Sequence, residues 1–239
     1  TLFAKIAGYG FSQVQFDFAS IGEEEMPAQI DGSLNERILQ SARDHQLEIV
    51  AVNGTFNIID RDQTVRDRGI ERFEVLARAC RDMKCPILTL CTGTRSIESM
   101  WTWHPDNESD QAWQDMMRSM QSLMTIAERH QITLGIETEA ANVVSSPERA
   151  RRLMDAFDSP LLKVILDGAN LFHRNTAFPE NVRPTLKHAF DVIGHDIILA
   201  HGKDIAASSE IRFAAPGKGI IDYDYFLDLL REYGYTAGM

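Results

Sequence analysis

Short apolar runs alternate with longer amphipathic stretches along the chain. The apolar runs are mostly rich in Val, Ile and Leu, and near-continuous apolar strands are typical of a parallel sheet that is covered on both faces. The pattern predicts six such strands: Val14–Phe18, Glu48–Val52, Ile87–Cys91, Thr133–Glu137, Lys163–Asp167 and Ile197–His201.

The longer stretches predict helices, because apolar side chains recur in them three and four positions apart. Ser146 and Pro147 are typical of the N-cap and first residue of a helix, and Gly234 is typical of a helix stop. The predicted helices are Asn35–His45, Val65–Met83, Asp110–His130, a segment that begins at Pro147, and Asp222–Tyr233.

Strands that alternate with helices at this spacing imply repeated βα units. The chain opens in F-A-K-I-A-G-Y-G-F, which resembles the end of a helix that leads into a strand, and it closes with a helix and G-Y-T-A-G-M. We therefore expect one more strand at each end, which gives the eight strands of a (β/α)8 TIM barrel. The sequence predicts an α/β fold of this class, with residues 1–239 as one barrel domain that is truncated at both ends and lacks the first and eighth strands.

Charge and hydropathy restrict the partners of the chain. Its composition, 44% hydrophobic and 25% charged, is that of an ordinary globular protein. The net charge of −11 and the absence of a Lys/Arg run argue against a nucleic-acid partner and favour a small or neutral substrate. No apolar run approaches the roughly 20 residues that cross a membrane.

The three cysteines, Cys80, Cys85 and Cys91, lie close together in the sequence. Their number is odd, and Cys80 and Cys85 do not have the C-x-x-C spacing of a metal or redox pair. We expect buried free thiols in a reducing compartment, and therefore a cytoplasmic protein.

Three consecutive predicted strands end in residues that can bind metals, namely Glu137, Asp167 and His201. The chemistry of a TIM barrel takes place at the carboxyl ends of its strands. Because side chains alternate along a strand and neighbouring strands lie about 4.8 Å apart, three inward side chains at this rim can converge on one ion. Two carboxylates and an imidazole suit a divalent cation such as Mn, Mg or Zn.

Each of these residues also has an ordinary interpretation by itself. A glutamate at a strand end is often solvated, an aspartate often caps the next helix, and a histidine is more often a hydrogen-bonded structural residue than a ligand. The hypothesis of a metal site therefore depends on the three residues together.

The segments around these residues are L-G-I-E-T-E, V-I-L-D-G-A-N, A-H-G-K-D and P-G-K-G. In this order they resemble the sugar phosphate isomerase/epimerase family, whose members are xylose-isomerase-like TIM barrels. The resemblance implies one divalent metal ion (Mn, Mg, Zn or Co), held by Glu137, Asp167, His201 and a glutamate on the eighth strand. It also implies that Glu137 is catalytic: it takes the proton next to the carbonyl group of a ketose or related polyol, and an enediolate forms on the metal.

The sequence departs from many members of this family at Asn170. They carry a histidine three residues after the metal-binding aspartate, whereas Asn170 can hydrogen-bond to a hydroxyl group but cannot act as a base near neutral pH. Both the substrate and the reaction therefore stay open.

Further candidates for substrate binding lie at the same rim. Lys203 lies two residues after His201 and is expected on the same side of the strand, where it could bind the substrate. Its alternative role is a salt bridge to Glu137, Glu139 or Asp204. Glu139 is also a reserve metal ligand. Aromatic residues after the strand Ile87–Cys91 are expected to form a wall of a sugar pocket or a subunit interface of a homo-oligomer. The candidates are Lys203, Asn170, Arg212, Asn142, Asn53, Trp101, Trp103 and His104.

The leading hypothesis is a metal-dependent isomerase or epimerase that acts on a small-molecule sugar. The alternatives are a lyase that resembles inosose dehydratase and a degenerate barrel that binds a ligand without catalysis. An enzyme that resembles endonuclease IV would need more histidines at strand ends and a basic face for DNA, which the charge of −11 argues against.

Overall fold

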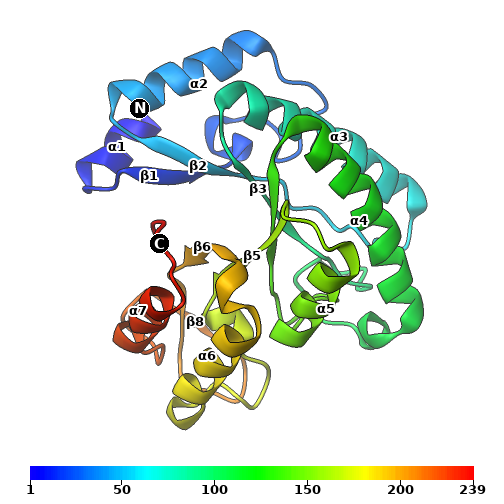
Figure 1. The fold of residues 1–239 in the computed structure, drawn as a ribbon, viewed down its shortest axis with the longest axis vertical. Helices are drawn as coiled ribbons and strands as arrows, with labels where there is room; N and C mark the ends of the chain where they lie inside the picture. The colour runs from blue at the N-terminus through cyan, green and yellow to red at the C-terminus, as the bar shows by residue number, and fades with distance from the viewer.

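Six parallel strands form the centre of the molecule and hydrogen-bond in chain order from β1 to β6. The computed structural model describes residues 1–239. The sheet curls into an open, C-shaped barrel, with β1 and β6 at its two edges (Figure 1). The strands are β1 (Gln13–Phe16), β2 (Glu48–Asn53), β3 (Ile87–Cys91), β4 (Thr133–Glu137), β5 (Leu162–Asp167) and β6 (Ile197–His201).

This arrangement confirms the predicted class of fold and all six predicted strands. Three of them have the predicted bounds, and the others differ by one or two residues at an end. The two further strands that the strand count implies stay a prediction.

Helices cover the outside of the curled sheet (Figure 1). They are α1 (Leu2–Gly8), α2 (Gly32–Asp44), α3 (Gln63–Met83), α4 (Asp110–His130), α5 (Pro147–Phe157), α6 (Pro179–Ile193) and α7 (Tyr223–Glu232). Short 3₁₀ helices occupy four connections: η1 (Phe18–Ile21), η2 (Pro105–Glu108), η3 (Ala169–Leu171) and η4 (Gly194–Asp196).

The structure confirms the predicted start signal at the N-terminus of α5 and the predicted stop signal after the C-terminus of α7. The Ser146 side chain accepts a hydrogen bond from the backbone N–H of Arg149 at the start of α5. Gly234 follows α7 with a φ of 78°, which glycine adopts at little cost. The hydrophobic pattern did not predict α6, which contains Pro184, a residue that usually ends a helix.

A short antiparallel hairpin, β7 (Asp204–Ile205) and β8 (Phe213–Ala214), follows the last barrel strand. Asp204 organises the segment from 204 to 221, because its buried carboxylate accepts hydrogen bonds from four backbone N–H groups. The four donors belong to Ile205, Gly217, Gly219 and Ile221.

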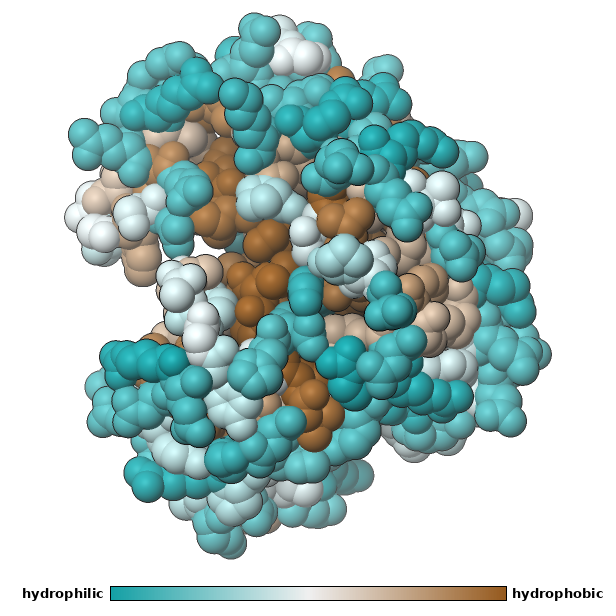
Figure 2. Space-filling model, viewed as in Figure 1, coloured by the Kyte–Doolittle hydropathy of each residue, from teal (hydrophilic) through white to brown (hydrophobic).

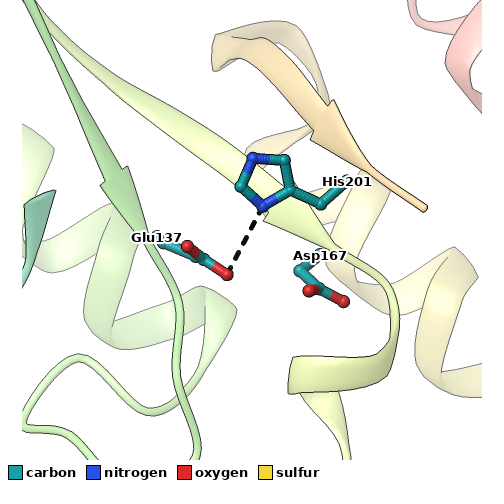
Figure 3. Close-up of side chains that lie close together, drawn as sticks. All are labelled: Glu137, Asp167 and His201. Carbon is teal, nitrogen blue, oxygen red and sulfur yellow. Dashed lines mark ion pairs between the residues drawn. The ribbon is translucent and has the colours of Figure 1, made fainter. Parts of the chain in front are cut away.

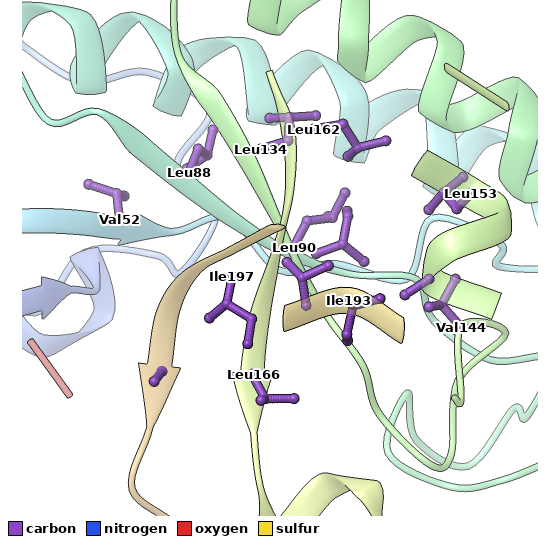
Figure 4. Close-up of a cluster of buried hydrophobic side chains, with 14 of the residues drawn as sticks. Val52, Leu88, Leu90, Leu134, Val144, Leu153, Leu162, Leu166, Ile193 and Ile197 are labelled. Carbon is purple, nitrogen blue, oxygen red and sulfur yellow. The ribbon is translucent and has the colours of Figure 1, made fainter. Parts of the chain in front are cut away.

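The strands separate two apolar layers. The larger layer lies between the sheet and the helices and includes Leu88, Leu134 and Leu166 (Figure 4). The smaller layer lies inside the barrel and consists of Ala51, Ile87, Ile165 and Leu199. Strand side chains therefore alternate between the two layers as the sequence predicts, and Ile165 and Leu199 lie two residues below Asp167 and His201.

The inside of the barrel is open on one side, between β1 and β6. Figure 2 shows apolar side chains in this hollow and hydrophilic residues around the outside of the molecule. At the edge of β6, the backbone N–H of Ala200 donates a hydrogen bond to the hydroxyl oxygen of Tyr235 at 3.0 Å.

The three cysteines are free and buried, as predicted. None of the helices is both long and apolar enough to cross a membrane.

Gly135 provides a test of the inner packing. A Cβ atom at this position would lie 2.8 Å from the side chain of Ile165. Strand propensity alone favours Gly135→Ala, but crowding inside the barrel opposes it. We expect Gly135→Ala to lower the free energy of unfolding by about 1 kcal/mol in urea titrations.

The matched control is Gly32→Ala at the start of α2, where nothing lies within 4 Å of the added Cβ atom. We expect this variant to be neutral or more stable by about 0.4–1 kcal/mol. Equal stabilisation in both variants would show that the interior next to Gly135 is not tightly packed.

Candidate metal centre

Glu137, Asp167 and His201 meet at one point of the barrel rim. Each is the last residue of its strand, and the parallel register pairs Asp167 directly with His201. One ligand atom from each of the three side chains lies within 4.8 Å of the other two. Figure 3 shows the three side chains, from three neighbouring strands, pointing toward a common centre.

Asp167 is the most buried of the three, with 1% of its surface exposed. Its Oδ1 accepts hydrogen bonds from the backbone N–H groups of Ala169 at 2.8 Å and Asn170 at 3.3 Å. Burial raises the pKa of this carboxyl group; the ammonium group of Lys203 lowers it, and the negative charge of Glu137 raises it further. The net shift is upward, so the ionised form of Asp167 needs positive charge nearby.

His201 uses both ring nitrogens. Nδ1 lies 3.6 Å from Oε1 of Glu137, and Nε2 lies 2.9 Å from the side-chain oxygen of Gln15 on β1. Burial lowers the pKa of His201, but the hydrogen bond and charge of Glu137, together with the charge of Asp167, outweigh this effect and raise it. In the tautomer that carries its proton on Nε2, the ring donates to Gln15 and presents the lone pair of Nδ1 to the two carboxylates.

These residues fit a divalent cation. Two carboxylate oxygens and one imidazole nitrogen are ligands that Mn, Mg, Zn and Co accept. Ligand atoms on one such ion lie roughly 3 to 4 Å apart, which small side-chain rotations achieve from the observed spacing. A cation would also compensate the two carboxylates, whose mutual repulsion contributes to the raised pKa of Asp167.

Asn170 and Lys203 extend the centre toward the solvent. The Asn170 side-chain amide donates to Oε1 of Glu137 at 2.7 Å, and its oxygen accepts from Nζ of Lys203 at 2.6 Å. The nearest carboxylate to Lys203 is Asp167, at 3.8 Å, so the structure does not show the alternative salt bridges to Glu137, Glu139 or Asp204. Asn170 therefore fixes the orientation of Glu137.

The metal centre borders a cavity of about 400 Å³ at the barrel mouth. Its lining combines the predicted residues Asn53, Trp101, Glu137 and His201 with Gln15, Asp17, Glu25, Thr55, Thr89 and Cys91. The sequence interpretation missed Gln15, Asp17, Glu25 and Thr89. The alternation of Gln15 and Asp17 in V-Q-F-D is a signal for two of them, because it places both on one face of the predicted strand Val14–Phe18, although β1 itself ends at Phe16 and Asp17 caps η1.

A second cavity of about 820 Å³ adjoins the first. Trp101 lines both cavities, and Asn170, which hydrogen-bonds to Glu137, lines the second. Trp103 and Glu139 also lie there. The sequence-predicted aromatic wall is thus next to the metal centre.

Four predicted substrate residues line neither cavity: Lys203, described above, and three others. Asn142 is 1% exposed and bonds to backbone groups, accepting from Gly93 and donating to Met100. His104 caps η2 by accepting from the backbone N–H of Asp106 at 3.1 Å. Arg212 is exposed in the loop of the β7–β8 hairpin. A role of these three in substrate binding stays a prediction that the geometry does not support.

Comparison with known proteins identifies the family. The model of a family described as the xylose isomerase-like TIM barrel matches residues 3–238. No curated protein matches the sequence significantly.

Solved structures with the same fold differ widely in sequence. A D-tagatose 3-epimerase-like protein is 18% identical, with a TM-score of 0.75, and the match covers 98% of this chain and 82% of that one. The IOLI protein with a binding zinc atom is 18% identical, with a TM-score of 0.70 and coverage of 99% and 81%. The probable 3-DHS dehydratase AsbF from Bacillus anthracis, involved in petrobactin synthesis, is 17% identical, with a TM-score of 0.72 and coverage of 98% and 84%.

Gln15 provides a test of how His201 is held. A hydrogen bond to the outer ring nitrogen orients a metal-binding histidine, and its loss typically weakens metal binding 10- to 100-fold. We expect Gln15→Leu to raise the Kd for Mn²⁺ by about this factor in calorimetric titrations.

Gln13→Leu is the matched control on the same strand, because Gln13 bonds to Glu48 and not to His201. We expect its Kd to match that of the unmodified protein. Equal affinities in both variants would show that Gln15 does not orient the ligand.

Proposed function

Because the chain belongs to the xylose isomerase-like TIM barrel family, we propose that it is a divalent-metal-dependent enzyme that isomerises or epimerises a ketose or related polyol. The observation that carries the proposal is the convergence of Glu137, Asp167 and His201 within 4.8 Å at the rim of the barrel. The family match and the geometry of these three residues support a barrel of this family with a candidate metal centre.

Glu137 is the proposed base. Its Oε1 receives the amide of Asn170, which holds the carboxylate in one orientation above the inner apolar layer. A divalent cation held by Glu137, Asp167 and His201 would polarise the carbonyl and hydroxyl oxygens of the sugar. Glu137 would then take the proton from the carbon next to the carbonyl and return it to another face or another carbon.

The surrounding polar groups suit hydroxyl recognition. Asn53, Thr55 and Thr89 line the mouth cavity together with Gln15. Amide and hydroxyl side chains both donate and accept hydrogen bonds, as sugar hydroxyl groups do. The acidic net charge and the buried free thiols agree with a cytoplasmic enzyme whose substrate is a small sugar, not a nucleic acid.

A dehydratase that uses the same three ligands is the second candidate. The Lys203 ammonium group and the carboxylate of Glu137 both hydrogen-bond to the side chain of Asn170, so an acid stands close to the proposed base. An elimination needs this pairing, because one group removes a proton and the other protonates the departing hydroxyl. Mass spectrometry of the product separates the candidates: loss of water indicates the dehydratase, and unchanged mass indicates isomerisation.

Asp167→Asn tests the metal centre. The substitution removes the charge of the most buried ligand, and we expect Mn²⁺ or Co²⁺ binding to fall at least about 100-fold by calorimetry. Asp82→Asn, at an exposed residue that pairs with Arg81, is the control and should bind metal normally. Full metal binding by Asp167→Asn would refute the site, and no binding by the unmodified protein would favour the degenerate ligand-binding barrel.

Glu137→Gln tests the base. An amide cannot accept the substrate proton, so the exchange of that proton with deuterated water should slow by about 10²- to 10⁴-fold. The measurement is proton NMR of a panel of ketoses incubated with metal-loaded enzyme. Glu71→Gln on the exposed surface of α3 is the control. Exchange at the normal rate in Glu137→Gln would assign the base to another residue.

A further inference from the structure

The cavity of about 820 Å³ beside the metal centre is not needed for a simple sugar. Resting on the proposed function, we propose that the substrate is a keto-glycoside: a sugar whose keto group lies away from its glycosidic carbon and is held at the metal centre, and whose glycosidic substituent, an uncharged aromatic ring or second sugar, lies in this second cavity. Four observations support this inference.

The first observation is continuity. Asn170 lines the second cavity, and its amide lies 2.7 Å from Oε1 of Glu137. Trp101 lines both cavities. A group attached to a sugar at the metal centre can therefore reach the second cavity.

The second observation is size. The mouth cavity of about 400 Å³ already falls within the range of small-molecule sites. The second cavity has about twice this volume. A single sugar ring at Glu137 would leave it empty.

The third observation is the lining. Trp101 and Trp103 are 56% and 53% exposed, and Phe213, which is 61% exposed, lines the same cavity. Large flat side chains of this kind stack on other rings and bury much apolar area. An open aromatic wall therefore favours a ring as its occupant.

The loop that carries the two tryptophans is held in place before any ligand binds. Oγ1 of Thr94 donates to the carbonyl of Thr102 at 2.8 Å, and the buried Asn142 amide donates to the carbonyl of Met100 at 3.1 Å. Arg95 and Asp115 form a buried ion pair at the base of the loop. Such preorganisation lowers the entropic cost of binding.

The fourth observation is charge. Arg174 and Glu210 in the cavity pair with each other, and Glu139 is a further carboxylate. Lys203, whose Nζ lies 4.1 Å from the centre of the Phe213 ring, is already bonded to Asn170. The lining thus holds two carboxylates, Glu139 and Glu210, against one arginine, with His173 as its other basic side chain, so an uncharged substituent suits it better than a phosphate group.

The test compares matched methyl and phenyl glycosides of several keto sugars, each with its keto group away from the glycosidic carbon, by calorimetry with the Mn²⁺-loaded protein. Disaccharides and sugar phosphates serve as further arms. We expect a phenyl glycoside to bind about tenfold more tightly than its methyl partner. Trp103→Ala should reduce this ratio to about one, whereas Ile97→Ala, at a 90% exposed residue outside both cavities, should preserve it. A disaccharide whose affinity exceeds that of the methyl glycoside by as much as the phenyl glycoside's does identifies a second sugar as the substituent.

The inference is overturned if no phenyl glycoside or disaccharide binds more tightly than its methyl partner, or if a sugar phosphate binds more tightly than all of them. It is also overturned if sedimentation shows a dimer that Trp103→Ala dissociates, because the aromatic wall would then face a second copy of the chain. A preference for phenyl in the unmodified protein, together with full metal binding by Asp167→Asn, supports the cavity while contradicting the metal centre. Normal metal binding by the unmodified protein without any preference for phenyl supports the metal centre and contradicts the role of the second cavity.

Discussion

The parallel register of β4, β5 and β6 brings three ionisable side chains to one point. Cys91 pairs with Glu137, Glu137 with Ile165, and Asp167 with His201, so the ends of the strands are aligned by backbone hydrogen bonds. The side chains cannot separate without breaking the sheet. Asp167 is thereby held as a nearly buried carboxylate beside a second one, which is costly unless positive charge is close. Lys203 supplies part of that charge, and a divalent cation bound to the neutral imidazole of His201 would supply the rest.

The interior below this point is small and apolar. Ala51 and Gly135 leave room for the larger Ile165 and Leu199, and this layer forms the floor beneath Glu137, Asp167 and His201. This floor excludes water from directly below the charged groups, while a further cavity on the open side between β1 and β6 reaches His201. Electrostatic interactions between them are stronger in such surroundings than in water.

Backbone contacts outside the strands determine how Lys203 and Asn170 are presented. The Asp204 carboxylate accepts hydrogen bonds from backbone N–H groups between residues 205 and 221 and so fixes this segment. The hydroxyl group of Tyr223 donates to the carbonyl of Lys203 at 2.9 Å. Lys203 is therefore held at the rim, where it reaches Asn170 and, through it, Glu137. This chain of contacts links the proposed base to the wall of the second cavity, so that chemistry and substrate selection share residues.

The sequence by itself determined the strands, the class of fold and the meeting of Glu137, Asp167 and His201. This was possible because a strand has a period of two, and the carboxyl ends of parallel strands lie at one rim. These rules need only local patterns and strand order.

Only the tertiary structure decided the partners of these residues. Gln15 reaches His201 from 186 positions away, and Asn142 and His104, equally plausible as substrate ligands in the sequence, bond instead to nearby backbone groups. The extent of the aromatic cavity likewise depends on loops that follow β3, β4, β5 and β7. Loop conformation is set by such long-range contacts and not by periodicity, so the sequence could place the candidate metal ligands but not the groups that orient them.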